Sequence, residues 1–186
     1  MDTPPPLSLK SLLSRLARVV GKTPAALYER QRVLMEAGLL QTVGGRGPGS
    51  GVRATPQAMA VLLIALLATE SVAEIGDRTP RVIKLKSTNK RCPITGKKTF
   101  GDALTAILAS GQLANKIDFI EVNRSGETAS ARIVTKPDAF FGKQPISHFG
   151  SDKVASAAGM STQVRLRLPL FAIANFLERD GDEGTE

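Results

Sequence analysis

The sequence has few of the residues on which disulfides, zinc sites and aromatic stacking depend. It contains one cysteine, Cys92, one histidine, His148, one tyrosine and no tryptophan. A single cysteine excludes an intramolecular disulfide and is typical of a protein of the reducing cytoplasm. One cysteine and one histidine are too few for a Cys/His zinc site, and one tyrosine without tryptophan disfavours an aromatic platform for stacked bases.

No group of residues has the spacing of a catalytic site. His148 lies near Ser147 and Asp152, but neighbours in sequence seldom form a triad, so we expect a structural or surface histidine. The glycine-rich stretch 44–51 does not end in Gly-Lys-Ser/Thr and follows no apolar strand, so it is not a phosphate-binding loop. The acids of the second half are scattered, without the pairing that acid–base chemistry needs. We therefore predict that the protein is not an enzyme and has no catalytic residue, metal or cofactor.

Long apolar runs are missing as well. The most apolar stretch, Ala58–Ala68, is shorter than the ~20 residues that a membrane-spanning helix needs, and it favours a buried helix. The N-terminal sequence MDTPPPLSLK lacks the basic-then-apolar order of a secretory signal. We expect a cytoplasmic protein with no membrane partner.

Positive charge is what the sequence has in excess. The net charge is +8, and it comes from two blocks: residues 1–56 hold eight Lys/Arg against three acids, and residues 81–100 hold seven against none. Such a field favours polyanionic partners, nucleic acid first and anionic membrane surfaces second. Plain solubility is the alternative explanation.

The first basic block begins with the pattern of a helix pair. Leucines at three- and four-residue spacing predict a first helix over 8–20, which Gly21 closes. Thr23-Pro24 is an N-cap followed by proline, and it predicts a second helix over 24–37. Two helices joined by a short turn are typical of a helix-turn-helix, in which the second helix enters the major groove of double-stranded DNA.

A glycine- and arginine-rich loop follows the helix pair. The stretch GGRGPGSG occupies 44–51, and Thr55-Pro56 then opens a third helix over 56–72 that is apolar on nearly all sides and must be buried. Glycines let the main chain approach phosphates closely, while arginines supply charge and forked donors. The segment 41–54 is therefore predicted to be a wing that lies on the DNA backbone or in the minor groove.

The same part of the chain resembles a known family. The stretches LARVVGKTPAALYE (16–29), AGLL (37–40), GVR (51–53) and TPQ (55–57) are similar to the N-terminal winged helix of MerR-type bacterial regulators. In that family a helix ending in glycine, a Ser/Thr-Pro start, a helix closing on Gly-Leu-Leu and an Arg/Gly wing follow one another. The resemblance, over about residues 12–68, implies a sequence-specific transcriptional regulator of bacterial type.

Side chains that face away from the first helix are the candidate DNA contacts. Leu27, Leu34 and Ala26 must face the core if the second helix packs against the first. The exposed arc of the second helix and the arginines of the wing then supply the predicted contacts, which are Lys22, Thr23, Tyr28, Arg32, Arg46 and Arg53. The two wing arginines are the stronger pair, because a glycine-rich loop has little structural reason to carry them.

The second basic block, within 76–98, is predicted to be a linker or an extended arm. RVIKLK alternates as a short strand does, and STNKRCPITGKK is polar and basic. Three interpretations remain open: a solvated linker, an arm that follows the DNA backbone, or a contact for an acidic protein. As an arm, its phosphate contacts are Lys84, Lys86, Lys90, Arg91, Lys97 and Lys98.

The second half predicts a small mixed α/β unit, so the expected fold class is α+β. Its expected elements are helices over 99–110 and 169–178 and strands over 117–123, 128–135 and 163–168, with a turn at 124–127 and irregular chain over 136–160. The expected domains are a disordered lead 1–7, a winged helix 8–75, the linker 76–98, an α+β domain 99–179 and an acidic tail 180–186.

The predicted function is sequence-specific DNA binding in transcription regulation, with the protein acting as a homodimer. The apolar helix 169–178 is the first candidate for self-association or contact with a protein partner, and the helix 56–72 is the second. One alternative is an adaptor of phage or mobile-element type whose winged helix binds a protein. The other is an enzyme of the C-terminal unit with a ligand pocket near 136–160.

Overall fold

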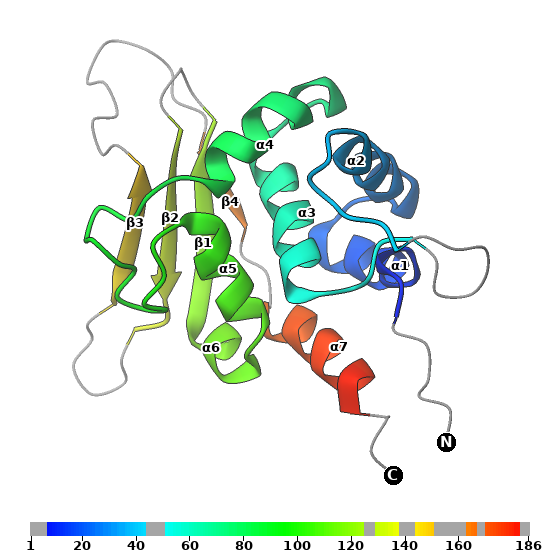
Figure 1. Ribbon diagram of the computed structural model, residues 1–186. Helices are drawn as coiled ribbons and strands as arrows, with labels where there is room; N and C mark the ends of the chain where they lie inside the picture. The colour runs from blue at the N-terminus through cyan, green and yellow to red at the C-terminus, as the bar shows by residue number, and fades with distance from the viewer. Residues whose placement is uncertain are drawn as a thin grey trace.

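The two helices at the N-terminus lie within one residue of their predicted bounds. In a computed structural model of the chain, the described residues are 7–43, 51–124, 129–137, 144–150, 163–166 and 170–182 (Figure 1). Helix α1 (Leu9–Val20) follows Ser8, whose side chain accepts from Ser11 N, and it ends at Gly21 with a left-handed φ of 63°. Helix α2 (Pro24–Glu36) follows Thr23, whose side chain accepts from Ala26 N. The predicted helix pair is thus confirmed.

Some of the sequence predictions fall outside the described residues. They are Arg46 with the rest of the loop 44–50, most of the N-terminal lead, most of the turn at 124–127, and the last residues of the acidic tail.

Helix α3 (Pro56–Ala68) lies at the centre of the molecule. Thr55 caps it, and all of its residues except Pro56, Gln57 and Leu66 are buried. It packs against helices α4 (Ile75–Ile83) and α5 (Phe100–Leu108), and it also contacts α2 and the strands β1 (Ile117–Asn123) and β4 (Gln163–Leu166). Figure 1 shows it between the sheet and the α1–α2 pair. The predicted burial of this helix is confirmed, and it comes from helices and strands of the same chain, not from a second subunit. The expectation that this helix offers a subunit interface is therefore wrong.

The segment predicted as a linker begins with a helix. After the short 3-10 helix η1 (Val72–Glu74), helix α4 (Ile75–Ile83) buries Ile75, Thr79 and Val82 against its neighbours. These residues recur at helical spacing across Pro80, and their burial outweighs the low helix propensity of proline. The strand expected over RVIKLK and the linker expected over 76–83 are both wrong.

The second half is built on one antiparallel sheet with the strand order β3-β2-β1-β4. The strands are β1 (Ile117–Asn123), β2 (Ser130–Thr135), β3 (Ile146–Gly150) and β4 (Gln163–Leu166). The helices are α5 (Phe100–Leu108), α6 (Gly111–Lys116) and α7 (Leu170–Asp182). The predicted strands β1, β2 and β4 and both predicted helices are confirmed. Strand β3 lies in a stretch predicted to be irregular, and α7 runs into the predicted acidic tail.

A single hydrophobic core joins the two halves. Its buried side chains run from Leu9 in α1 through α3 and the sheet to Ala174 in α7. In α7, Leu170, Ile173 and Ala174 are buried, whereas Phe171 is 44% exposed. The α+β class is confirmed, but the expected division at a linker is not, because α3 and α4 belong to the same core as the sheet.

Candidate nucleic-acid interface

The chain after α2 returns to the start of α1 and is fixed there by backbone hydrogen bonds. Val43 and Gly51 exchange N–H···O bonds of 2.9 and 3.2 Å. Leu9 N donates to Val52 O at 2.7 Å, and Ala54 N donates to Leu7 O at 2.9 Å. The base of the glycine-rich loop is therefore a small β-arrangement, which holds exposed Arg53 opposite Ser8 at the beginning of α1.

Helix α2 presents one face to the core and one to solvent. Leu27 and Leu34 are fully buried, as predicted, and Ala26 is half-buried. Lys22 and Tyr28 are exposed, as a DNA contact must be. Thr23 is exposed too, but its hydroxyl oxygen accepts from Ala26 N at 3.2 Å, so it serves first as the helix cap.

Arg32 differs from the other predicted contacts because two carboxylates neutralise it. Its guanidinium lies 2.8 Å from Glu29 and 2.9 Å from Glu36. The hydrogen bond to Glu29, with the charges of Glu29 and Glu36, raises the pKa of Arg32. Both acids stand three or four residues away, a spacing that the sequence already contained and that brings side chains together on a helix. A phosphate at Arg32 would have to displace them.

The exposed side of α1 adds cations that the sequence analysis left out. Lys10, Arg15 and Arg18 are exposed, and α1 contains no acid. Lys10 Nζ lies 5.2 Å from the centre of the Tyr28 ring, within the range of a cation–π contact. Because this contact joins α1 to α2, sequence spacing within either helix could not reveal it. We call Lys10, Lys22, Tyr28 and Arg53 the helix-pair surface.

Two further arginines, Arg30 of α2 and Arg124 directly after β1, serve the fold. Arg124 donates to the carbonyl oxygens of Leu66 and Leu67 at 2.8 and 2.6 Å, and Arg30 donates to Glu70 O at 3.1 Å. Burial lowers the pKa of Arg124, although the nearby Glu70 opposes that shift. These guanidinium groups satisfy carbonyl groups at the C-terminal end of α3 that would otherwise lack a partner.

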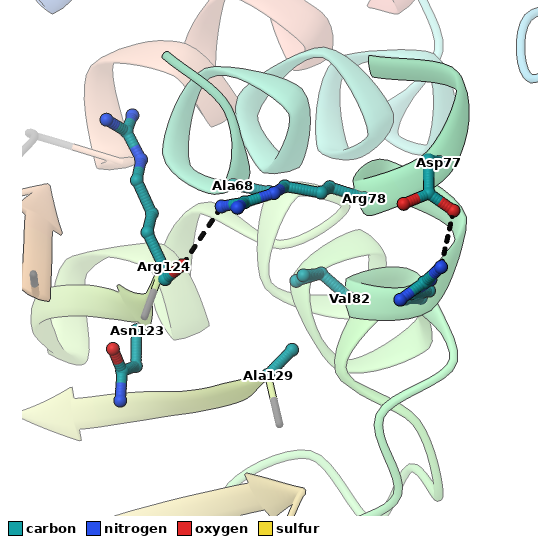
Figure 2. Close-up of a pocket in the computed structure, with 8 residues that line it drawn as sticks. Ala68, Asp77, Arg78, Val82, Asn123, Arg124 and Ala129 are labelled. Carbon is teal, nitrogen blue, oxygen red and sulfur yellow. Dashed lines mark hydrogen bonds and ion pairs between the residues drawn. The ribbon is translucent and has the colours of Figure 1, made fainter. Parts of the chain in front are cut away.

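A shallow hollow lies beside these groups, between α4 and the end of β1. It measures about 170 Å³, and Figure 2 shows Arg78 donating to the carbonyl of Arg124. Asp77 and Arg81, which also line the hollow, form an ion pair. The two hydrogen bonds measure 2.9 and 2.6 Å. Within the described residues, no group of three or more His, Cys, Asp or Glu side chains is placed to hold a metal ion.

The second basic block is folded into a hairpin and not an open linker. Lys86 pairs with Thr99, and Cys92 N donates to Lys97 O at 2.7 Å. The first arm adds to the sheet beyond β3, where Ser87 pairs with Phe149. We call residues 86–99 the basic hairpin.

The basic hairpin is anchored through its backbone and its one buried side chain near the tip. Gly150 N donates to Lys86 O at 2.9 Å, and Thr88 N donates to His148 O at 3.0 Å. Cys92 is buried, with its sulfur 3.2 Å from the hydroxyl of Ser147. The prediction of a solvated linker is therefore wrong for this segment, since a linker has no such anchorage.

All six cations predicted for this block are exposed. They are Lys84, Lys86, Lys90, Arg91, Lys97 and Lys98. Lys84 caps the end of α4, and the other five belong to the basic hairpin. In the part of the chain that the structure describes, none of them forms an ion pair. Arg91 donates a long 3.4 Å hydrogen bond to Gly96 O.

A partly apolar groove of about 550 Å³ is lined by the chain after α2, by the beginning of α3 and by the end of α4. Leu39, Val43, Val52 and Val61 contribute to its walls, and Ile83 of α4 lies along it as well. Arg53 is also part of its lining. The groove could not be read from the sequence, because it forms only when the chain after α2 and the end of α4 pack beside the beginning of α3.

Comparisons with protein families, with curated proteins and with solved structures find no match for this chain. Among the described helices, none alone is long and apolar enough to span a membrane, and α3 reaches the required length only together with 72–83, at a bend of 119°.

Proposed function

We propose that the protein is a double-stranded DNA-binding transcriptional regulator that contacts DNA through the helix-pair surface. The observation that carries the proposal is the joining of Lys10 and Tyr28 across α1 and α2, next to a β-bridged loop that carries Arg53. An exposed helix that follows a short turn and precedes a basic loop has the arrangement of a winged helix-turn-helix.

The roles within this surface follow from position and charge. The N-terminal half of α2, with Lys22 and Tyr28, enters the major groove, because residues there contact base edges in helix-turn-helix proteins. Lys10 and Arg53 lie on either side of the major groove of the DNA and neutralise phosphates, which fixes the orientation of the protein on the duplex without reading its base sequence. Arg32 stays with its carboxylates and contributes less than the sequence analysis expected.

Assembly belongs to the same proposal. One such module gives limited affinity and specificity, so two copies acting on paired half-sites suit a cytoplasmic regulator. Phe171 of α7 is an exposed aromatic side chain, and it supports self-association through the C-terminal half.

The test is a salt series of mobility shifts on genomic duplex fragments. We expect binding that weakens steeply with salt, since each neutralised phosphate adds roughly 0.9 to the log–log slope. R46A/R53A should lower affinity equally on all sequences, whereas the double variant K116Q/K136Q, which removes two exposed cations remote from α2, should bind as wild type. Salt-insensitive binding, or no binding to any fragment, contradicts the proposal.

A second candidate function is a protein-interaction adaptor, and the groove lined by Leu39, Val52 and Val61 is what favours it. Apolar walls beside exposed polar side chains suit a peptide or helix of a partner protein. Co-purification separates the two functions. A regulator brings nucleic acid with a raised 260/280 absorbance ratio, whereas an adaptor brings a protein whose binding V43D abolishes, because Val43 lines the groove and is exposed.

A further inference from the structure

We propose that the basic hairpin is a second duplex-binding surface, so that one chain bridges two segments of DNA. The inference rests on the proposed function for its first duplex. It adds a second site on another part of the fold.

The basic hairpin and Lys22 of the helix-pair surface lie near opposite edges of the sheet. The hairpin extends the sheet beyond β3, whereas Lys22 and Arg30 share a hollow with Val164 of β4. From the hairpin arm to β4 there are four inter-strand steps of about 4.8 Å, so the sheet alone separates them by about 19 Å. Figure 1 shows α3 between the sheet and the α1–α2 pair, which adds to the separation.

The surfaces also face in different directions. Leu27 and Leu34 bury the inner side of α2, so its exposed side points away from the core and from the sheet. A duplex seated on that side leaves the basic hairpin open on the other side of the molecule. A single straight duplex therefore does not satisfy both surfaces at once.

The chemistry of the hairpin fits a phosphate backbone. Its five cations have no ion-pair partner among the described residues, whereas Arg32, Arg78 and Arg81 are each paired with acids three or four residues away in the chain. Four of the five are lysines, which act as point charges on phosphates, and the hairpin contains no aromatic ring for stacking on unpaired bases. Binding here is expected to be independent of base sequence.

The cations are not needed to hold the hairpin together. Lys97 and Lys98 contribute their carbonyl oxygens, which accept from Cys92 N and Ser87 N, while their side chains are exposed. K97Q/K98Q therefore removes two charges and keeps every backbone hydrogen bond. K116Q/K136Q removes the same charge elsewhere and is the matched control.

The experiment is a capture assay with the full chain, in which a biotinylated duplex on beads recovers a second, fluorescent duplex. Wild type and K116Q/K136Q should capture the second duplex, and K97Q/K98Q should lose most of this capture. The affinity of K97Q/K98Q for a single specific duplex, measured by anisotropy, should stay within about twofold of wild type, because the base-specific contacts are proposed to lie on α2.

The outcomes separate the two proposals. Binding of one duplex by wild type without capture of a second overturns the bridging inference and leaves the proposed function standing. Capture that survives K97Q/K98Q also overturns it, because a dimer joined by two helix-pair surfaces then does the bridging. Absence of any duplex binding overturns both.

Discussion

The helix-pair surface and the basic hairpin differ in how their charges are used. On α2, Arg32 is paired with Glu29 and Glu36, and the Tyr28 ring lies against the Lys10 ammonium group. The helix-pair surface therefore presents its shape and a small number of unpaired groups to a partner. The basic hairpin has five exposed cations and no acid, and it contains no helix that could enter the major groove of DNA. Local charge balance favours selective contact, whereas uncompensated charge favours affinity for any polyanion.

The comparison holds only if both surfaces belong to one folded body with a shared hydrophobic core. A substitution that creates a cavity in α3 tests this, and it has the largest expected effect on stability. Leu63 is fully buried in the shared core, so L63A should lower the free energy of unfolding by about 2–5 kcal/mol. Chemical denaturation followed by circular dichroism should keep a single transition. The control Q57A, at an exposed position of the same helix, should change stability by less than about 0.5 kcal/mol. Two separate transitions would show that the halves fold independently.

Replacing Tyr28 tests whether α2 reads bases. Y28A should change the preferred site and cost about 1–3 kcal/mol of discrimination, since it removes a side chain from the groove face. Selection of binding sites from a random duplex library measures this. K97Q/K98Q should select the wild-type site, and a Y28A protein that does so as well would remove α2 from the reading role.

Releasing Arg32 tests whether charge balance limits the affinity of α2. E29Q/E36Q removes both carboxylates that hold the guanidinium, so Arg32 becomes free for a phosphate. We expect tighter binding, with the log–log salt slope steeper by roughly 0.9. Anisotropy in a salt series measures the slope, with E29Q/E36Q/R32Q as the control in which the gain disappears. An unchanged slope in E29Q/E36Q would mean that DNA does not approach this face.

The smallest expected effect concerns the turn between α3 and α4. Hydrogen bonds from the backbone N–H groups of Glu70 and Ser71 lower the pKa of Glu74. A carboxyl with a depressed folded pKa stabilises the fold above its unfolded pKa, and this stability is lost as pH falls through the folded pKa. E74Q should therefore be slightly less stable than wild type at neutral pH, with the difference shrinking in acid. A difference that grows as pH falls would contradict this cause.

Local signals made the helix caps and three strands predictable. Thr23 and Thr55 cap helices because a side-chain oxygen followed by proline and an apolar repeat specifies a helix start. Strand β2 alternates apolar and polar residues, as a strand with one buried face does.

The features that the sequence did not predict depend on contacts between segments that are distant in the chain. Helix α4 contains Gly76 and Pro80, which favour a turn until α3 covers its apolar side. The hairpin is fixed by pairing with β3, and the contact of Lys10 with Tyr28 requires α1 beside α2. The neutralisation of Arg32 is different, since the spacing of Glu29 and Glu36 was readable from the start.

Amine footprinting of the full chain with and without a duplex tests the central claim most directly. Lysines at a DNA contact lose reactivity toward an acylating reagent, which mass spectrometry detects residue by residue. We predict protection of Lys10 and Lys22 with one duplex per chain, protection of Lys97 and Lys98 when duplex is in excess, and none at Lys116 or Lys136. Unchanged reactivity of Lys10 and Lys22, or equal protection of Lys116 and Lys136, would contradict DNA binding through the helix-pair surface.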